Sequence, residues 1–122
     1  MKLLIVDDSK AMRMLVRRAL RQAQIGDHTI EEATNGQEAL TKLRAERFDI
    51  VLADWNMPEM NGLALLQAAK GEGLAPRFGF ITSESSEATH NLALENGAEF
   101  LITKPFTPEA VRNALQQGTG AK

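Results

Sequence analysis

The sequence predicts an α/β fold in which five strands and five helices alternate to form a doubly wound parallel sheet. Short apolar runs are separated by longer stretches in which apolar residues recur every three or four positions. Strands that alternate with amphipathic helices form βα units around a parallel sheet. The predicted strands span residues 3–6, 29–33, 50–53, 78–82 and 100–103, and the predicted helices span residues 10–24, 37–46, 63–70, 86–96 and 108–117.

The first βα unit has the clearest pattern. The run LLIV is apolar throughout, as expected for a strand that helices cover on both faces. In the helix that follows, apolar residues share one face: Met12, Leu15, Val16, Ala19 and Leu20. Arg13, Arg17 and Arg21 lie four residues apart on another face, which we expect to be solvated.

The later units follow the same alternation, although the second and fourth strands differ from the others in composition. The segment HTIEEA is more polar than the other strands, which suits an edge of the sheet. Asn35-Gly36 and Asn96-Gly97 mark a turn before a helix and a helix end. Gly79 interrupts the fourth strand, and the sequence gives no reason for it.

Length and composition predict one domain over residues 1–122, with a core at about 2–117 and a frayed tail at 118–122. The 122 residues are 43% hydrophobic, contain no cysteine and carry a net charge of −2. The sequence shows neither an apolar run of membrane-spanning length nor a signal peptide, so we expect a cytoplasmic protein that does not bind membranes. Its small net charge gives no reason to expect nucleic-acid binding, and we expect a monomer.

Polar residues stand where four of the predicted strands end. Asp7 and Asp8 follow LLIV, Asp54 follows IVLA, and Thr82 and Lys104 end the last two strands. Any one of these residues could instead cap a helix or form a turn. In a parallel sheet, however, the carboxyl ends of the strands meet at one crevice where ligands bind. The sequence therefore predicts that these groups share one site.

Three carboxylates and one ammonium in a single crevice indicate a phosphoryl site with a divalent cation. The carboxylates repel each other unless a cation joins them, and Mg²⁺ prefers a few such oxygen ligands. Lys104 and the hydroxyl of Thr82 can bind phosphoryl oxygens. Asp54, which lies between the acidic pair and the lysine in the inferred sheet, is the candidate nucleophile for an acyl phosphate.

Four motifs identify a family resemblance over residues 2–117. VDDS at 6–9, DWNMPEMNG at 54–62, IT at 81–82 and GAEFLITKPF at 97–106 together resemble a response-regulator receiver domain. DWNMP is similar to single-domain chemotaxis regulators of the CheY type. The resemblance implies a flavodoxin-like fold with strand order 2-1-3-4-5.

The resemblance also implies a role for each site residue. Asp54 would accept a phosphoryl group from a histidine kinase or phosphotransfer protein, and Thr82 and Lys104 would contact that group. Mg²⁺ would be bound by Asp8, Asp54 and the backbone carbonyl of Asn56, with Asp7 acting through water. The Lys104-Pro105 bond would be cis. Asn56, Ser83 and Glu84 would tune the site and the lifetime of the acyl phosphate.

One position departs from the family pattern. Leu101 stands where many members carry an aromatic switch residue, and Phe100 should point to the opposite face of its strand. We nevertheless expect the phosphorylated form to bind a downstream protein, through the face made by the predicted helix 86–96, the strand 100–103 and the helix 108–117. A phosphatase is a further partner consistent with the resemblance.

Other functions fit the sequence less well. A flavodoxin-like electron carrier needs a hydroxyl- and glycine-rich first loop, whereas DDSKAM places two negative charges there. Aspartate-dependent phosphatases space two aspartates by one residue, whereas Asp7 and Asp8 are adjacent. An unphosphorylated interaction module would be expected to lack a residue of the acidic pair, the acceptor Asp54 or Lys104, and all of them are present. A stand-alone receiver in a non-chemotaxis phosphorelay or adaptor role remains the alternative.

Overall fold

The computed structural model describes residues 1–74, 76–84 and 86–118, and the ten predicted elements are confirmed within it. The first helix ends at Gln22, two residues early, because Gln24 adopts a left-handed backbone with φ of 56°. The frayed tail was predicted to begin at residue 118, but Gly118 still belongs to the last helix. Residues 119–122 of that predicted tail lie outside the described residues. The elements are β1 Lys2–Val6, α1 Lys10–Gln22, β2 Thr29–Ala33, α2 Gly36–Ala45, β3 Ile50–Ala53, α3 Gly62–Gly71, β4 Arg77–Thr82, α4 Glu87–Glu95, β5 Phe100–Thr103 and α5 Pro108–Gly118.

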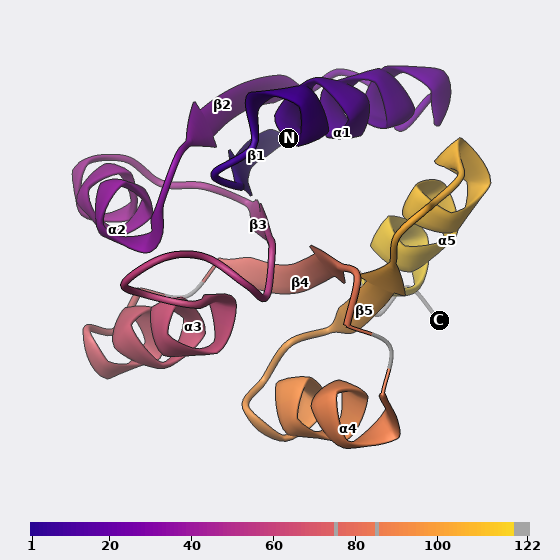
Figure 1. Cartoon of the computed structure of the whole chain (residues 1–122). Helices are drawn as coiled ribbons and strands as arrows, with labels where there is room; N and C mark the ends of the chain where they lie inside the picture. The colour runs from indigo at the N-terminus through magenta and orange to yellow at the C-terminus, as the bar shows by residue number, and fades with distance from the viewer. Residues whose placement is uncertain (75, 85, 119–122) are drawn as a thin grey trace.

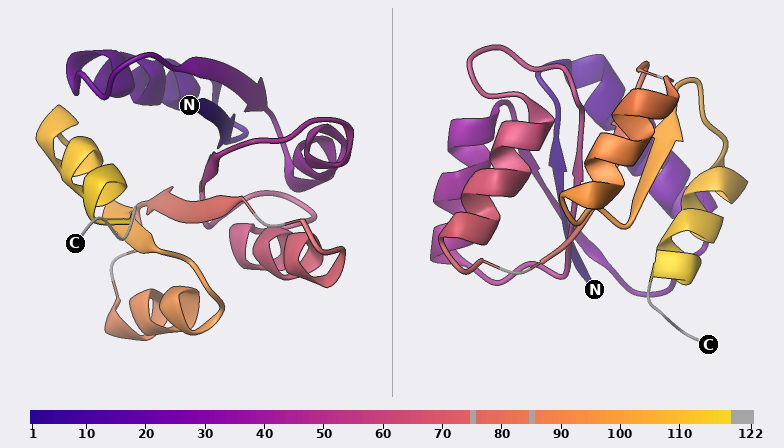
Figure 2. Two further views of the ribbon diagram at one scale, coloured as in Figure 1. Left: turned by 180° about the vertical axis from the view of Figure 1, so that it is seen from behind. Right: turned by 90° about the horizontal axis from the view of Figure 1, so that it is seen from below.

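The five strands form one parallel sheet in the predicted order β2-β1-β3-β4-β5. The polar strand β2 lies at one edge, as its composition indicated, and β5 lies at the other. Helices α1 and α5 cover one face of the sheet, and α2, α3 and α4 cover the other (Figures 1 and 2). Among the described residues, none of the helices combines the length and the apolar character needed to cross a bilayer.

Each face of the sheet has its own hydrophobic core, because alternate strand residues point to opposite faces. Leu4 and Val6 of β1 belong to the core that α2, α3 and α4 complete, whereas Leu3 and Ile5 belong to the core that α1 and α5 complete. All four of these side chains are almost fully buried. A strand buried in this way can move little, so the residues directly after Val6 have a fixed position at the carboxyl edge.

The expectation of a solvated arginine face on α1 is wrong for Arg13 and only partly right for Arg17. Arg13 is buried and donates a hydrogen bond to Glu32 of β2 over 2.7 Å, and Arg17 is half-buried against the same carboxylate. Helical spacing alone does not show that this face lies against an edge strand. Leu15, which we expected on the apolar face, is 50% exposed.

Gly79 of β4 makes room for the aromatic ring of Phe100. The two residues are directly opposite each other in the β4-β5 pair. A Cβ atom at position 79 would lie 2.2 Å from Cζ of Phe100, far inside van der Waals contact. The glycine that the sequence could not explain therefore allows the Phe100 ring to cover the backbone of β4.

Candidate functional site

The three predicted carboxylates meet at the carboxyl edge of the sheet. Asp7 and Asp54 directly follow Val6 and Ala53, which are opposite each other in the β1-β3 pair. One carboxylate oxygen from each of Asp7, Asp8 and Asp54 lies within 4.8 Å of the others. Asp7 is buried, Asp54 is half-buried and Asp8 is exposed, so the cluster opens to solvent on the side of Asp8.

Lys104 supplies the positive charge of this cluster. Its Nζ lies 3.3 Å from Oδ2 of Asp7 and 3.4 Å from Oδ2 of Asp54, and its side chain is only 16% exposed. Burial raises the pKa of Asp7, and the nearby charge of Asp54 acts in the same direction. The backbone N–H of Ser9, 2.9 Å from Oδ1, and the ammonium of Lys104 oppose that rise.

Thr82 completes the predicted group of strand-end residues. Its side chain is fully buried, and its Oγ1 accepts a hydrogen bond from the backbone N–H of Glu84 over 3.2 Å. Because that bond uses the oxygen only as an acceptor, the hydroxyl proton remains available to a ligand. Ser83, which follows Thr82, is exposed.

Two of the predicted tuning residues contact each other. Nδ2 of Asn56 donates to Oε2 of Glu84 over 3.2 Å, so the β3-α3 loop is linked to the β4-α4 loop. The backbone N–H of Asn56 also faces Oδ1 of Asp54 at 3.3 Å. Asn56 therefore links Asp54, through its backbone N–H, to Glu84, through its side chain. Sequence alone matched these positions to the family but did not show their contact.

The segment after Asp54 packs back onto the core through Trp55. The ring centroids of Trp55 and the fully buried Phe80 lie 5.0 Å apart in an edge-to-face arrangement. The backbone N–H of Gly62 donates to the carbonyl of Trp55, and a Cβ atom at position 62 would lie 2.5 Å from the carbonyl oxygen of Asp54. The indole is thus held against the core one residue after Asp54, so its emission can report on changes at Asp54.

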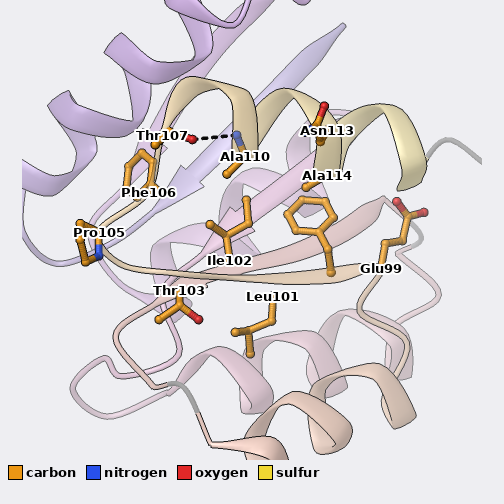
Figure 3. Close-up of a pocket in the computed structure, with 11 residues that line it drawn as sticks. Glu99, Leu101, Ile102, Thr103, Pro105, Phe106, Thr107, Ala110, Asn113 and Ala114 are labelled. Atoms are coloured by element: carbon orange, nitrogen blue, oxygen red, sulfur yellow. Dashed lines mark hydrogen bonds between the residues drawn. The ribbon is translucent and has the colours of Figure 1, made fainter.

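At β5, the structure confirms the opposite directions expected for neighbouring residues. Leu101 packs against the core that faces α2, α3 and α4, whereas Phe100 packs against the core that faces α1 and α5. Figure 3 shows Leu101 and Ile102 pointing to opposite sides of the strand, with Ile102 towards α5. The Lys104-Pro105 peptide bond that follows is cis, as predicted.

The donor set fits Mg²⁺. Three carboxylates that converge at one partly exposed edge of the sheet offer the hard oxygen ligands that Mg²⁺ accepts, and the exposed side leaves room for the waters it retains. Asn56 lies two residues after Asp54, at the same edge of the sheet. The cluster contains no sulfur or imidazole ligand of the kind that Zn²⁺ favours.

Comparison with known proteins gives a consistent picture. The family model described as "Response regulator receiver domain" matches residues 3–116. The chain is 38% identical to a chemotaxis protein CheY homolog of Campylobacter jejuni, over 99% of this chain and 95% of the relative. Its structure is similar to chemotaxis protein CheY4 of Vibrio cholerae, with a TM-score of 0.84, 33% identity, and coverage of 95% of this chain and 96% of the other.

A second structural likeness is to the signal receiver domain of the putative response regulator NarL from Mycobacterium tuberculosis. The TM-score is 0.84 at 26% identity, over 99% of this chain and 97% of the other. The flavodoxin-like sheet order, the acidic cluster beside a lysine, and the family match over nearly the whole length all agree. The chain therefore belongs to the response regulator receiver domain family.

Proposed function

We propose that this chain is a phosphorylation-dependent switch of a two-component system, with Asp54 as the phosphoryl acceptor and chemotaxis as its pathway. The observation that carries the proposal is the position of Lys104, whose ammonium lies between the carboxylates of Asp7 and Asp54. The relatives named as chemotaxis proteins support the pathway. In this role the chain acts in the cytoplasm, as a phosphoacceptor rather than an enzyme with a separate substrate.

The proposed reaction is phosphoryl transfer from a phosphohistidine of a kinase or phosphotransfer protein. A carboxylate oxygen of Asp54 forms a bond to phosphorus while the P–N bond breaks, and the electron pair leaves on the imidazole nitrogen. Asp8, Asp54 and the carbonyl of Asn56 would hold Mg²⁺, with Asp7 acting through water. The bound cation would neutralise the phosphoryl oxygens in transfer.

Lys104 and Thr82 would stabilise the transferred group. A phosphoryl group on Asp54 gives the Lys104 ammonium an anionic partner in place of the carboxylate, and Lys104 is already within 3.4 Å of that side chain. The Thr82 hydroxyl can donate to a phosphoryl oxygen because its present bond with Glu84 uses it as an acceptor. Asn56, Ser83 and Glu84 would tune how fast the acyl phosphate is hydrolysed.

Output would pass through the face formed by α4, β5 and α5. Thr82 is opposite Thr103, and Phe80 is opposite Leu101, so a shift of Thr82 acts directly on β5. Since Leu101 has no aromatic ring to reorient, we propose that backbone movement in β5 carries the signal. Amide chemical shifts recorded with a phosphoryl mimic should then change along β5 and α4; changes confined to the Asp54 loop would exclude this route.

Trp55 emission tests the proposed function. Adding Mg²⁺ and then a small phosphodonor should give two successive changes in emission, because the indole lies beside the cluster. Both changes should be lost or strongly altered in Asp54→Ala, whereas Asp49→Ala, on the opposite edge of the sheet, should behave as wild type. A wild-type protein that responds to neither addition would refute the proposal.

The second candidate is a receiver of a phosphorelay outside chemotaxis, for which the NarL likeness provides an example of another regulator with this fold. The two candidates share the chemistry and differ in the partner of the phosphorylated form. Binding of phosphorylated protein to purified flagellar switch components would support chemotaxis. Absence of that binding, together with normal phosphorylation of Asp54, would favour the second candidate.

A further inference from the structure

Arg13 of α1 is a buried charged side chain that the proposed chemistry does not use. The residue is 9% exposed, and its guanidinium donates a buried hydrogen bond of 2.6 Å to the backbone carbonyl of Asp7. Its Nε donates to Oε1 of Glu32 over 2.7 Å. A buried guanidinium is costly unless fixed acceptors compensate its lost hydration, so these two contacts define where the side chain must lie.

The carbonyl that Arg13 contacts belongs to the peptide unit between Asp7 and Asp8. Because a peptide unit is planar, fixing the direction of this carbonyl also fixes the position of the Asp8 Cα. The backbone N–H of Asp7 is held by the carbonyl of Ala33 at 3.1 Å, so this short segment is anchored from two sides. No hydrogen bond or ion pair from another described residue holds the Asp8 carboxylate, so its placement depends on its backbone.

Glu32 anchors the guanidinium to the sheet. It lies in β2 opposite Ile5, and it also accepts a hydrogen bond from Arg17, which donates to the carbonyl of Ile30 over 3.2 Å. Hydrogen bonds from Arg17 and Arg13 lower the pKa of Glu32, so it stays charged at neutral pH. Arg13 is therefore held by a structural ion-pair network on one side and contacts the acidic loop on the other.

We infer that Arg13 is a positioning residue for the cation site: it orients the Asp7-Asp8 peptide unit so that both carboxylates converge with Asp54. The inference rests on the proposed function, since it assumes that this cluster binds Mg²⁺. Groups that orient metal ligands from outside the coordination sphere commonly change metal affinity by about 10- to 100-fold when they are removed. Arg17 shares the Glu32 partner but does not contact Asp7, which makes it the matched control.

The test is Mg²⁺ titration of the intact protein, followed by Trp55 emission and by calorimetry, at a temperature where circular dichroism shows every variant folded. Arg13→Met should weaken Mg²⁺ binding by about tenfold. Arg13→Lys should recover part of this loss, because an ammonium can donate to the Asp7 carbonyl but lacks the fork that also holds Glu32. Arg17→Met should bind Mg²⁺ as the wild type does.

A core variant separates positioning from general destabilisation. Val16→Ala removes buried volume from the same helix without touching the acidic loop, and its Mg²⁺ affinity should equal that of the wild type. Equal affinity in Arg13→Met and wild type would overturn the inference, as would equal losses in the Arg13 and Val16 variants. If Arg13→Met does not fold, Arg13→Lys carries the test and should still bind measurably more weakly than wild type. A wild-type protein without Mg²⁺ binding would refute the proposed function itself, and this inference with it.

Discussion

Gly79→Ala is expected to destabilise the protein by forcing Phe100 out of its place. The added Cβ atom would lie 2.2 Å from Cζ and 2.3 Å from Cε1 of the Phe100 ring, where contacts under 3.0 Å are essentially never seen. Either the ring leaves its site or the two strands separate. Overpacking of this kind costs about 1–3 kcal/mol, and loss of the burial of a partly exposed phenylalanine is of the same order, at most about 1.5–3 kcal/mol.

Urea unfolding measures this cost. With a dependence of about 1–3 kcal/mol per M urea, a loss of about 2 kcal/mol lowers the midpoint by roughly 1 M. The functional consequence follows from position, since Gly79 lies three residues before Thr82, and Phe100 lies four residues before Lys104. A displaced β4-β5 pair should therefore also reduce the Trp55 response to a phosphodonor.

The double variant tests the assigned cause. Phe100→Leu removes the ring that meets the new methyl group, so Gly79→Ala should cost at least about 1 kcal/mol less in that background than in wild type, a coupling typical of residues in contact. A Gly79→Ala variant as stable as wild type would refute the reasoning. A loss of unfolding free energy in Gly79→Ala that Phe100→Leu leaves unchanged would also refute it, because the loss would then arise from the backbone of β4.

Two further predictions concern the loops and the edge strand. Asn56→Ala and Glu84→Ala should each shorten the lifetime of the acyl phosphate, because each breaks the same hydrogen bond beside Asp54. The lifetime is measured as the decay of the Trp55 signal after the phosphodonor is removed. The double variant should shorten it little further, and additive effects would show that the two residues act separately. Arginine contacts lower the folded pKa of Glu32 below its ordinary 4.5, so its stabilising contribution is complete above pH 4.5 and is lost as pH falls through the folded value. Thermal unfolding of Glu32→Gln should therefore depend less on pH below 4.5 than that of the wild type, and an unchanged dependence would contradict the assignment.

The sequence was sufficient to predict the ten elements and the meeting of three carboxylates and a lysine at one edge of the sheet. Parallel strands deliver their carboxyl ends to one edge, so the positions of Asp7, Asp54 and Lys104 after apolar runs predicted their proximity. The strand order and the cis bond before Pro105 came from the family resemblance, and the structure confirms both.

The contacts that the sequence did not reveal lie between elements that are far apart in the chain. Helical spacing placed Arg13 on a solvated face because it contains no information about Glu32, nineteen residues later on a neighbouring strand. Likewise, Gly79 looked like a weak point of β4, because the residue that requires it, Phe100, lies on the neighbouring strand β5 and twenty-one residues later in the chain. The packing of α1 against β2 decides the first case, and the register between β4 and β5 decides the second. Both follow from the packed fold rather than from local pattern.

The central claim, that Asp54 accepts the phosphoryl group, is tested most directly by chemical trapping. Protein incubated with Mg²⁺ and a small phosphodonor is reduced with borohydride, which converts an aspartyl phosphate to homoserine, and the modified residue is located by peptide mass spectrometry. We predict homoserine at position 54, and none when Mg²⁺ is chelated or when Asp54 is replaced by Ala. Modification at Asp7 or Asp8 in place of Asp54, or no modification at all, would contradict the assignment.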